Sequence, residues 1–542
     1  MEIVFVVLAL LVAVTVSGTL ERIVPVPLPL LQIALGVVLA LSPLPSVELS
    51  SEIFFLVLLP PLLFLDGWRI PKESLRQDGR LILALALGLV VFTVLGMGWF
   101  IHWLVPAMPQ AVAFALAAVL APTDPIAVSA VAKQAPIPPR LMHILEGESL
   151  LNDASGLVCL RFAIAAALTG SFSATEAFAT FLWLAVAGIA IGVAVTLGVT
   201  YVQDRILSRV GEDPGTQTLL SLLIPFGVYL LAEEVHASGI LAAVAAGVTM
   251  SFVENQGRAL ALTRMRRSAV WDTVQLAVNG AIFVLLGEQL PGIVDKATSG
   301  ALSSDGLNLA ELALLALVIA AALAFFRFVW VCISLALTLR RNRLAGAPVI
   351  PFPIGLAVAT ALAGVKGAVT LAGILTLPFV LSDGSPFPAR DLAIFLAMSV
   401  ILISLVTATI VLPPVLRRVR LPPTPARDDE ERQAREVAAR AAREAIQTLR
   451  DSLTRTADEP TLYSEAAGRA LVRYEQLVDG SEAGDIARGR EMFQAERRLR
   501  LAGLRAERDA LFDLRRRHAM PDDTLRRLIR EVDLLEARFD GG

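Results

Sequence analysis

Apolar segments of about 20 residues recur through the first 420 residues of this chain and constrain its fold more than any other feature. A segment of this length can cross a bilayer as an α-helix, which satisfies its backbone hydrogen bonds internally, as a chain in lipid must. We place thirteen spans, near residues 3–20, 23–41, 52–66, 81–105, 110–132, 143–169, 177–202, 217–232, 238–253, 271–290, 309–339, 352–380 and 391–416. The sequence therefore predicts an all-α polytopic membrane protein.

The residues after the last span differ in composition from the spans. The whole chain is 56% hydrophobic, whereas residues 427–542 contain 23 Arg, 25 Asp plus Glu and no Lys. We expect a transmembrane domain (1–420), a Pro-rich linker (421–426) and a soluble helical tail (427–542). Arginines that alternate with acids give a solvated surface, so we expect no nucleic-acid binding. The sequence leaves two interpretations of the tail. Either it self-associates or regulates the transmembrane domain, or it is a solvated extension without such a role.

Lys and Arg are distributed unequally between alternate loops. The loops after odd-numbered spans carry 16 of them, and the loops after even-numbered spans carry only Lys296 and Arg390. Positive charge marks the cytoplasmic side, which predicts an outside N-terminus and a cytoplasmic tail in the cell (inner) membrane. The odd number of spans fits two inverted repeats of six helices, joined by the seventh span.

Two spans at matching positions of these halves carry signals for a break. The fifth contains Ala121-Pro122-Thr123-Asp124-Pro125, and proline both removes a donor and clashes with the preceding turn. The twelfth contains Gly364-Val365-Lys366-Gly367. In transporters built of inverted repeats, broken helices place the substrate site near the bilayer midplane. Thr123 and Asp124 are therefore candidate cation ligands, the alternative being that Asp124 is a plain helix cap beside a kink.

Polar residues also cluster in the sixth span. Glu148, Ser149, Asn152 and Asp153 lie within six residues, and Ser149 and Asp153 share one helix face. A carboxylate at bilayer depth costs roughly 2.5–3.5 kcal/mol on insertion scales, so it indicates a function. We predict that Asp153 binds either a proton or a cation, and competition for one carboxylate couples two ion flows. The alternative is a structural carboxylate in a helix contact.

Buried charges need partners. Arg327, Lys366 and Arg161 are the candidate counter-charges for Glu148, and for Arg161 a pair with some other acid is favoured. Asp66 ends the third span, where it is either an interfacial residue or an acid of a cation funnel.

The motifs at 121–125, 146–153 and 364–369 resemble the sodium/proton exchanger family, over residues 1–420. They are most similar to the Asn-Asp branch of the monovalent cation–proton antiporters, including bacterial members with a charged tail. The resemblance implies thirteen spans, crossed broken helices five and twelve, and a homodimer in the membrane.

The resemblance also implies roles for single residues. Asp153 corresponds to the carboxylate that binds the cation and the proton, with Asp124, Thr123 and Ser149 around a Na⁺ ion. Glu148 and Arg327 correspond to a buried ion pair. Lys366 is a departure, because the family usually has Arg there.

We therefore expect an antiporter that exchanges Na⁺, or Li⁺ or K⁺, for H⁺ and serves pH homeostasis. Asn152 cannot titrate, which favours electroneutral one-for-one exchange, as is general in that branch. The alternatives are a K⁺/H⁺ antiporter and a channel or sensor that uses the same cluster for gating. The chain has no phosphate-binding glycine loop, and we expect no enzyme activity, catalytic residue or cofactor.

Overall fold

The computed structural model describes residues 2–42, 54–69, 79, 82–125, 128–129, 139–169, 174–210, 213–254, 261–298, 308–344, 354–381, 384–418, 425–456, 464–471, 486–517, 528–529 and 531–536. The chain divides into two compact units, Met1–Leu421 and Pro422–Gly542. We refer to them as the membrane unit and the tail unit.

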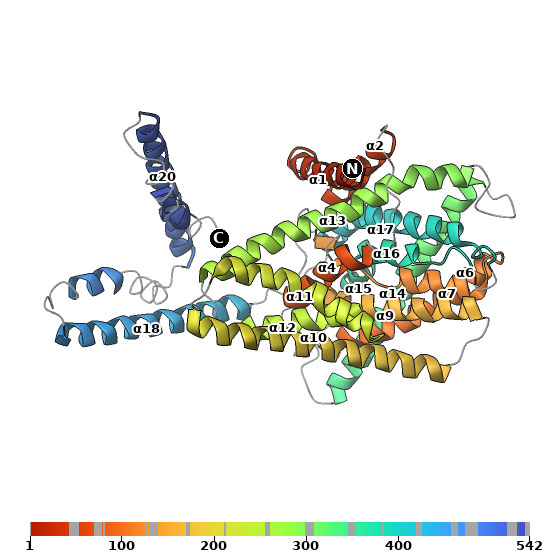
Figure 1. The fold of residues 1–542 in the computed structure, drawn as a ribbon, viewed down its shortest axis with the longest axis horizontal. Coiled ribbons are helices and arrows are strands. Elements are labelled where there is room, and N and C mark those ends of the chain that lie inside the picture. The colour runs from red at the N-terminus through yellow and green to blue at the C-terminus, as the bar shows by residue number, and fades with distance from the viewer. Residues whose placement is uncertain are drawn as a thin grey trace. The chain divides into compact units, whose positions relative to one another are not determined.

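The membrane unit is built of helices (Figure 1). In chain order they are α1 (Glu2–Leu20), α2 (Leu28–Ala40), η1 (Phe54–Leu58), α4 (Leu59–Arg69), η2 (Ala84–Leu89), α6 (Val90–Leu104), α7 (Gln110–Leu120), α9 (Pro139–Thr169), α10 (Ala174–Val210), α11 (Pro214–Glu234), α12 (Gly239–Glu254), α13 (Ala261–Thr298), α14 (Leu309–Leu344), α15 (Ile354–Leu362), α16 (Ala368–Leu375) and α17 (Arg390–Arg418). Among the described residues, six helices are long and apolar enough to cross a membrane, and five shorter ones are apolar. The expected all-α polytopic class is confirmed.

Several helices are longer than the apolar pattern alone indicates. The tenth expected span was 271–290, whereas α13 covers Ala261–Thr298. The third was 52–66, whereas α4 continues to Arg69 and leaves Asp66 inside the helix. Hydropathy detects only the part of a helix that suits lipid, so polar turns at helix ends escape it.

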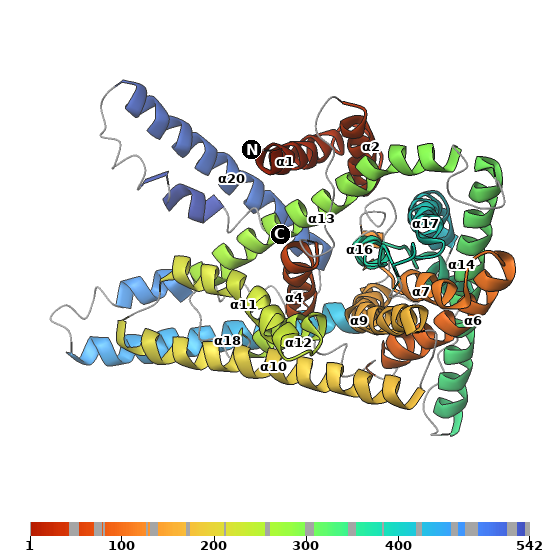
Figure 2. The same cartoon turned by 45° about the vertical axis from the view of Figure 1, so that its right-hand side comes forward.

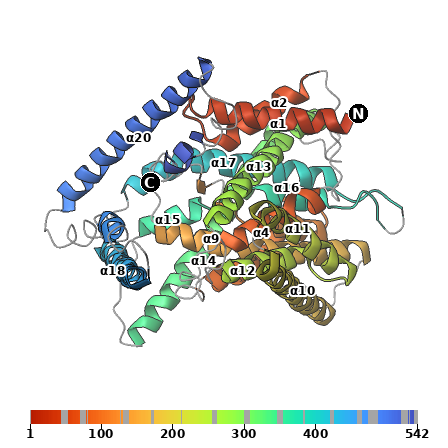
Figure 3. The same cartoon turned by 60° about the vertical axis from the view of Figure 1, so that its left-hand side comes forward.

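The helices of the membrane unit form two groups. The crossing group contains η2, α6, α7, α9 and α14–α17, and its members pack mainly on one another. The scaffold group contains α1, α2, η1, α4 and α10–α13. In Figure 2, α11 lies to the left, α7, α14 and α17 to the right, and α4 between them. Figure 3 shows α1 and α2 side by side, next to α13.

Glycines allow the scaffold helices to approach to backbone contact. A Cβ on Gly247 of α12 would lie 2.0 Å from the carbonyl oxygen of Phe64 on α4. A Cβ on Gly287 of α13 would lie 2.0 Å from the carbonyl oxygen of Ile33 on α2. Lipid is as apolar as leucine, so helices in a membrane associate through close packing of this kind.

The crossing group contains two interrupted helices. α7 ends at Leu120, residues 121–124 are not helical, and Pro125 is helical again. Likewise α15 and α16 are separated by a non-helical segment, 363–367. The two segments meet, because the Asp124 amide donates a 2.8 Å hydrogen bond to the Val365 carbonyl. Irregular backbone is tolerated at this depth because protein surrounds it.

The tail unit is also helical. It contains α18 (Pro425–Thr456) and α20 (Ile486–Arg516). α18 starts inside the segment expected as a linker, since proline is well tolerated in the first turn of a helix. Arg508 of α20 forms ion pairs with Asp533, at 2.8 Å, and with Glu536. These pairs join α20 to a short helical stretch at 531–536.

Candidate functional site

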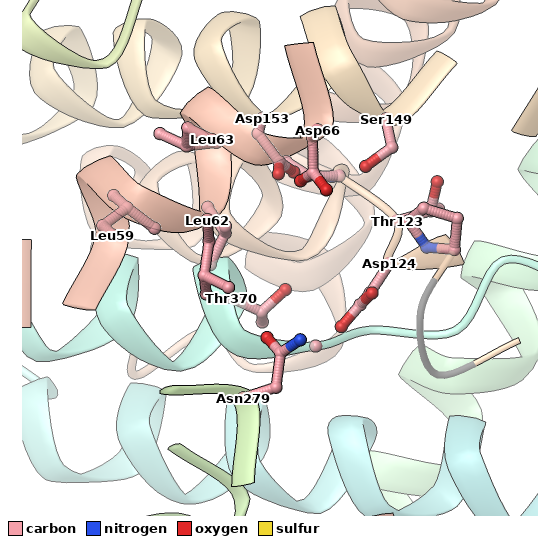
Figure 4. Close-up of a pocket in the computed structure, with 14 residues that line it drawn as sticks. Leu59, Leu62, Leu63, Asp66, Thr123, Asp124, Ser149, Asp153, Asn279 and Thr370 are labelled. Carbon is pink, nitrogen blue, oxygen red and sulfur yellow. The ribbon is translucent and has the colours of Figure 1, made fainter. Parts of the chain in front are cut away.

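A small cavity lies at the seam between the crossing group and the scaffold group (Figure 4). Its volume is about 30 Å³. A single buried water needs about 10–15 Å³, so the cavity has room for two or three waters or for a small cation. Its walls are formed by Leu59, Leu62, Leu63, Asp66, Pro122, Thr123, Asp124, Pro125, Ser149, Asp153, Asn279, Gly367, Val369 and Thr370.

Three carboxylates line this cavity, from three different helices or breaks. Asp153 comes from α9, Asp124 from the break after α7, and Asp66 from α4. Asp153 is only 7% exposed and lies within electrostatic range of both other acids. Among the described residues, no three or more His, Cys, Asp or Glu side chains are arranged to hold a metal ion together. Further oxygens in the cavity wall come from Thr123, Ser149, Asn279 and Thr370.

Lys366 lies at the open end of α7. Its ammonium group donates to the carbonyl oxygens of Pro122, at 2.9 Å, and of Ala121, at 3.2 Å. The last carbonyls of a helix have no partner within it and carry partial negative charge. Lys366, from the break between α15 and α16, therefore neutralises the partial negative charge of the carbonyls exposed where α7 is interrupted.

Asp124 makes the reciprocal contact. A Cβ on Gly367, the residue before α16, would lie 1.8 Å from Asp124 Oδ2, so only glycine leaves room for this carboxylate. The N-terminal end of a helix carries partial positive charge, which favours an anion there. Each break thus supplies a charged side chain to the helix end exposed by the other break.

A buried ion pair lies behind the cavity. Arg327 of α14 binds both carboxylate oxygens of Glu148, at 2.5 and 2.8 Å, and both side chains are at most 5% exposed. The remaining Arg327 Nε donates to the carbonyl of Thr360 at 2.9 Å, in the last turn of α15. This two-point contact selects Arg327 among the three candidate partners of Glu148.

The ion pair is connected to the cavity through hydroxyl and amide groups. The Thr123 hydroxyl donates to Glu148 Oε1 at 3.2 Å and accepts from Asn152 Nδ2 at 3.1 Å. Asn152 is 1% exposed and does not line the cavity. Asn152 therefore acts on the cavity indirectly, because its hydrogen bond orients the hydroxyl of Thr123.

The structure also places two further residues singled out in the sequence. Asp66 lines the cavity from the last turn of α4, beside Asp124 and Asp153. Arg161 pairs with Glu233 of α11 at 3.3 Å, far from Glu148, and both side chains are substantially exposed. The favoured expectation for Arg161, a pair with another acid, is therefore confirmed.

Sequence analysis missed Asn279 and Thr370 as cavity residues. Asn279 is an amide in the middle of the apolar tenth span, and that position was a usable signal. Thr370 gave no such signal, because threonine is common in apolar helices and often bonds to its own backbone.

Comparison with known proteins supplies the family. The profile of the sodium/hydrogen exchanger transmembrane family matches residues 6–418. The chain belongs to this family. Its members are membrane transporters and not enzymes, and bacterial relatives place it in the plasma membrane.

Individual relatives cover nearly the whole chain. It is 40% identical over 546 residues to an uncharacterised Na⁺/H⁺ exchanger of Escherichia coli, YjcE, with 99% of each protein covered. It is 35% identical to a sodium, potassium, lithium and rubidium/H⁺ antiporter of Bacillus subtilis, covering 100% of this chain and 78% of the relative. Among solved structures, the sodium proton antiporter MjNhaP1 of Methanocaldococcus jannaschii matches in fold with a TM-score of 0.58 at 18% identity. That match covers 77% of this chain and 99% of the solved one.

Proposed function

We propose that the protein is a secondary antiporter that exchanges a monovalent cation for a proton at the seam cavity, by alternating access. The observation that carries the proposal is the convergence of Asp66, Asp124 and Asp153 on one cavity of ionic size. Acids within a membrane are retained at ion and proton pathways. The family and the relatives named above support the same function.

The cation would bind at Asp153 and Asp124, with oxygens of Thr123 and Ser149 completing its shell. All four residues line the cavity and belong to the crossing group. Carboxylates and hydroxyls are hard oxygen ligands, which suit Na⁺. Asp66 reaches the same space from the scaffold group and would attract the cation as a funnel acid.

Alternating access would follow from the position of the cavity between two groups of helices. Motion of the crossing group against the scaffold group would carry Asp153 and Asp124 together, because the Asn152–Thr123 hydrogen bond joins α9 to the break after α7. Asp66 and Asn279 would stay with the scaffold. Movement of one helix bundle against another is general in such transporters.

The exchange would be one cation for one proton. Asp153 is the carboxylate whose charge changes, whereas Asn152 is a neutral amide. Asp124 would keep its charge beside the N-terminal end of α16, and Glu148 is paired with Arg327. One positive charge then leaves as another enters, and the membrane potential does not drive the cycle.

Sodium is the first cargo to test, and potassium is the second candidate. The Bacillus subtilis relative is described as transporting sodium, potassium, lithium and rubidium, which favours a broad choice of cations. Such exchange would serve pH homeostasis. We also propose a membrane homodimer with an outside N-terminus and a cytoplasmic tail.

The test measures proton movement in everted vesicles with a pH-sensitive dye as Na⁺, Li⁺ or K⁺ is added. We expect cation-dependent dequenching that Asp153→Asn abolishes at normal expression. Asp213→Asn is the matched control, because Asp213 caps α11 through Thr216 and asparagine caps equally well.

The opposite result is equally clear. Wild-type vesicles that respond to none of the three cations between about pH 6 and 9, with folded protein, would refute antiport and favour the channel or sensor alternative. A wild-type response that persists in Asp153→Asn would remove Asp153 from the central role.

A further inference from the structure

A buried aromatic and ionic cluster holds the end of α4 that carries Asp66. Trp68 of α4 donates from its indole N–H to Glu254 Oε2 at 2.6 Å, and Arg267 donates to Glu254 Oε1 at 2.6 Å. The Arg267 guanidinium lies over the Trp68 ring, 5.5 Å from its centroid. Arg267 is 3% exposed, so the ion pair is shielded from water. We call Trp68, Glu254, Arg267, Trp271 and Phe64 the α4 clamp.

The second half of the clamp is aromatic. Phe64 stacks on Trp271 of α13, with ring centroids 5.3 Å apart and an interplanar angle of 25°. Trp271 is fully buried, and its indole N–H donates to the hydroxyl of Ser221 on α11 at 3.2 Å. The clamp thereby fastens α4 to α11, α12 and α13 together.

The clamp and Asp66 occupy opposite faces of α4. Phe64 and Trp68 are four residues apart and share a face, since an α-helix turns about 100° per residue. Asp66 is two residues from each, about 200° around the axis, and lines the cavity. Gly67, which lies between Asp66 and Trp68 in the sequence, packs on the backbone of α12, where a Cβ would lie 2.5 Å from the Val244 carbonyl oxygen. A shift or rotation of α4 at the clamp would therefore move the Asp66 carboxylate within the cavity.

The clamp belongs to the scaffold side alone. Its partners lie on α11, α12 and α13, whereas Asp153, Asp124 and Thr123 lie in the crossing group. Arg69, at the end of α4, adds a hydrogen bond to Gln275 at 2.6 Å and an ion pair with Asp272, both on α13. The clamp thus holds α4 through helices of the scaffold group and not through the residues that face Asp66 across the cavity.

We propose that the α4 clamp is a positioning device that sets the apparent cation affinity of the transporter through Asp66. Trp68 and Glu254 are the positioning residues, and neither lines the cavity. This inference rests on the proposed function, in which Asp66 attracts the transported cation.

The experiment compares Trp68→Phe with wild type in proteoliposomes, measuring the Na⁺ dependence of proton movement. The substitution keeps an aromatic side chain but removes the indole N–H and its hydrogen bond to Glu254. We expect the apparent KM for Na⁺ to change by about three- to tenfold, with a maximal rate within about twofold of wild type. Trp183→Phe, on the exposed face of α10, is the matched control and should leave KM unchanged.

A second background distinguishes positioning from a general structural role. In Asp66→Asn the residue to be positioned has lost its charge, so adding Trp68→Phe should leave KM where Asp66→Asn alone puts it. Glu254→Gln, which keeps an acceptor for Trp68 but weakens the hold on Arg267, should show the same dependence on Asp66. It also replaces Trp68→Phe if that variant does not fold.

Three results would overturn the inference. One is an equal change of KM in both backgrounds. Another is a lower melting temperature with an unchanged KM in both clamp variants. The third is an Asp66→Asn variant with the wild-type KM, because nothing would then need positioning. The proposed antiport itself is judged separately, by the loss of exchange in Asp153→Asn.

Discussion

Among the described residues, the crossing group contains two helices interrupted by non-helical segments that meet beside buried charges, whereas the scaffold group packs through glycines and carries its buried Arg267 on the continuous helix α13. The crossing group compensates the charges at its breaks within itself: Lys366 faces the carbonyl end of α7, and Asp124 faces the start of α16. The scaffold group depends on backbone contacts at Gly247 and Gly287. The comparison teaches that interrupted backbone within a helical bundle is stabilised by charged side chains at the exposed helix ends, whereas continuous helices can associate through backbone contacts alone.

The largest effect should come from breaking the Glu148–Arg327 pair. We expect Glu148→Ala or Arg327→Ala to lower the free energy of unfolding by about 3–5 kcal/mol, because a buried charge remains uncompensated. Melting in detergent measures the loss. The double variant should lose less than the sum of the two single variants. Strictly additive losses would mean that the two side chains do not stabilise each other.

Removing the charge at the end of α7 should come next. Lys366→Met removes one charged donor from two backbone carbonyls, and we expect a total loss of about 1.5–3 kcal/mol. The melting temperature should fall clearly, and Lys366→Arg should recover part of the loss. Lys296→Met is the control, because Lys296 is half-exposed at its pair with Asp391. Equal melting temperatures for the two methionine variants would show that α7 needs no counter-charge.

The scaffold group can be tested at its glycine contacts. Gly247→Ala forces α12 away from Phe64 of α4 and should cost about 1–3 kcal/mol, the usual range for overpacking. Gly227→Ala in α11 is the matched control, since its Cβ would meet nothing within 4 Å. Thermal melting of both variants measures the loss of stability, which we expect for Gly247→Ala and not for Gly227→Ala. If both melt like wild type, close helix approach does not hold the scaffold group together.

The smallest effect should come from the pair between the two groups. Arg161 of α9 and Glu233 of α11 have side chains that are 48% and 38% exposed. We expect Arg161→Ala to change stability by less than about 1 kcal/mol, as exposed ion pairs usually do. A loss as large as that of Arg327→Ala would show that the groups depend on this contact, and the contrast drawn above would fail.

Sequence reasoning reached the residues whose chemistry is unusual for their surroundings. Asp153, Asp124, Glu148 and Arg327 are charged in apolar segments, and a charge in lipid requires a reason wherever it occurs. The breaks were found on the same basis, from Pro122 and Pro125 and from paired glycines. Residues with ordinary properties were not found, and Thr370 in the cavity wall is the example.

The sequence by itself determined that the chain is a polytopic helical membrane protein with two broken helices and a buried acid at Asp153, because local composition and periodicity encode these features. Only the tertiary structure decided which partner each charge has: Arg327 for Glu148, Glu233 for Arg161, and the carbonyls of the opposite break for Lys366. It also decided that Asp66 faces the cavity. The physical reason is that pairing depends on how helices distant in sequence are packed and rotated, and that packing is settled by many small contacts that no single motif records.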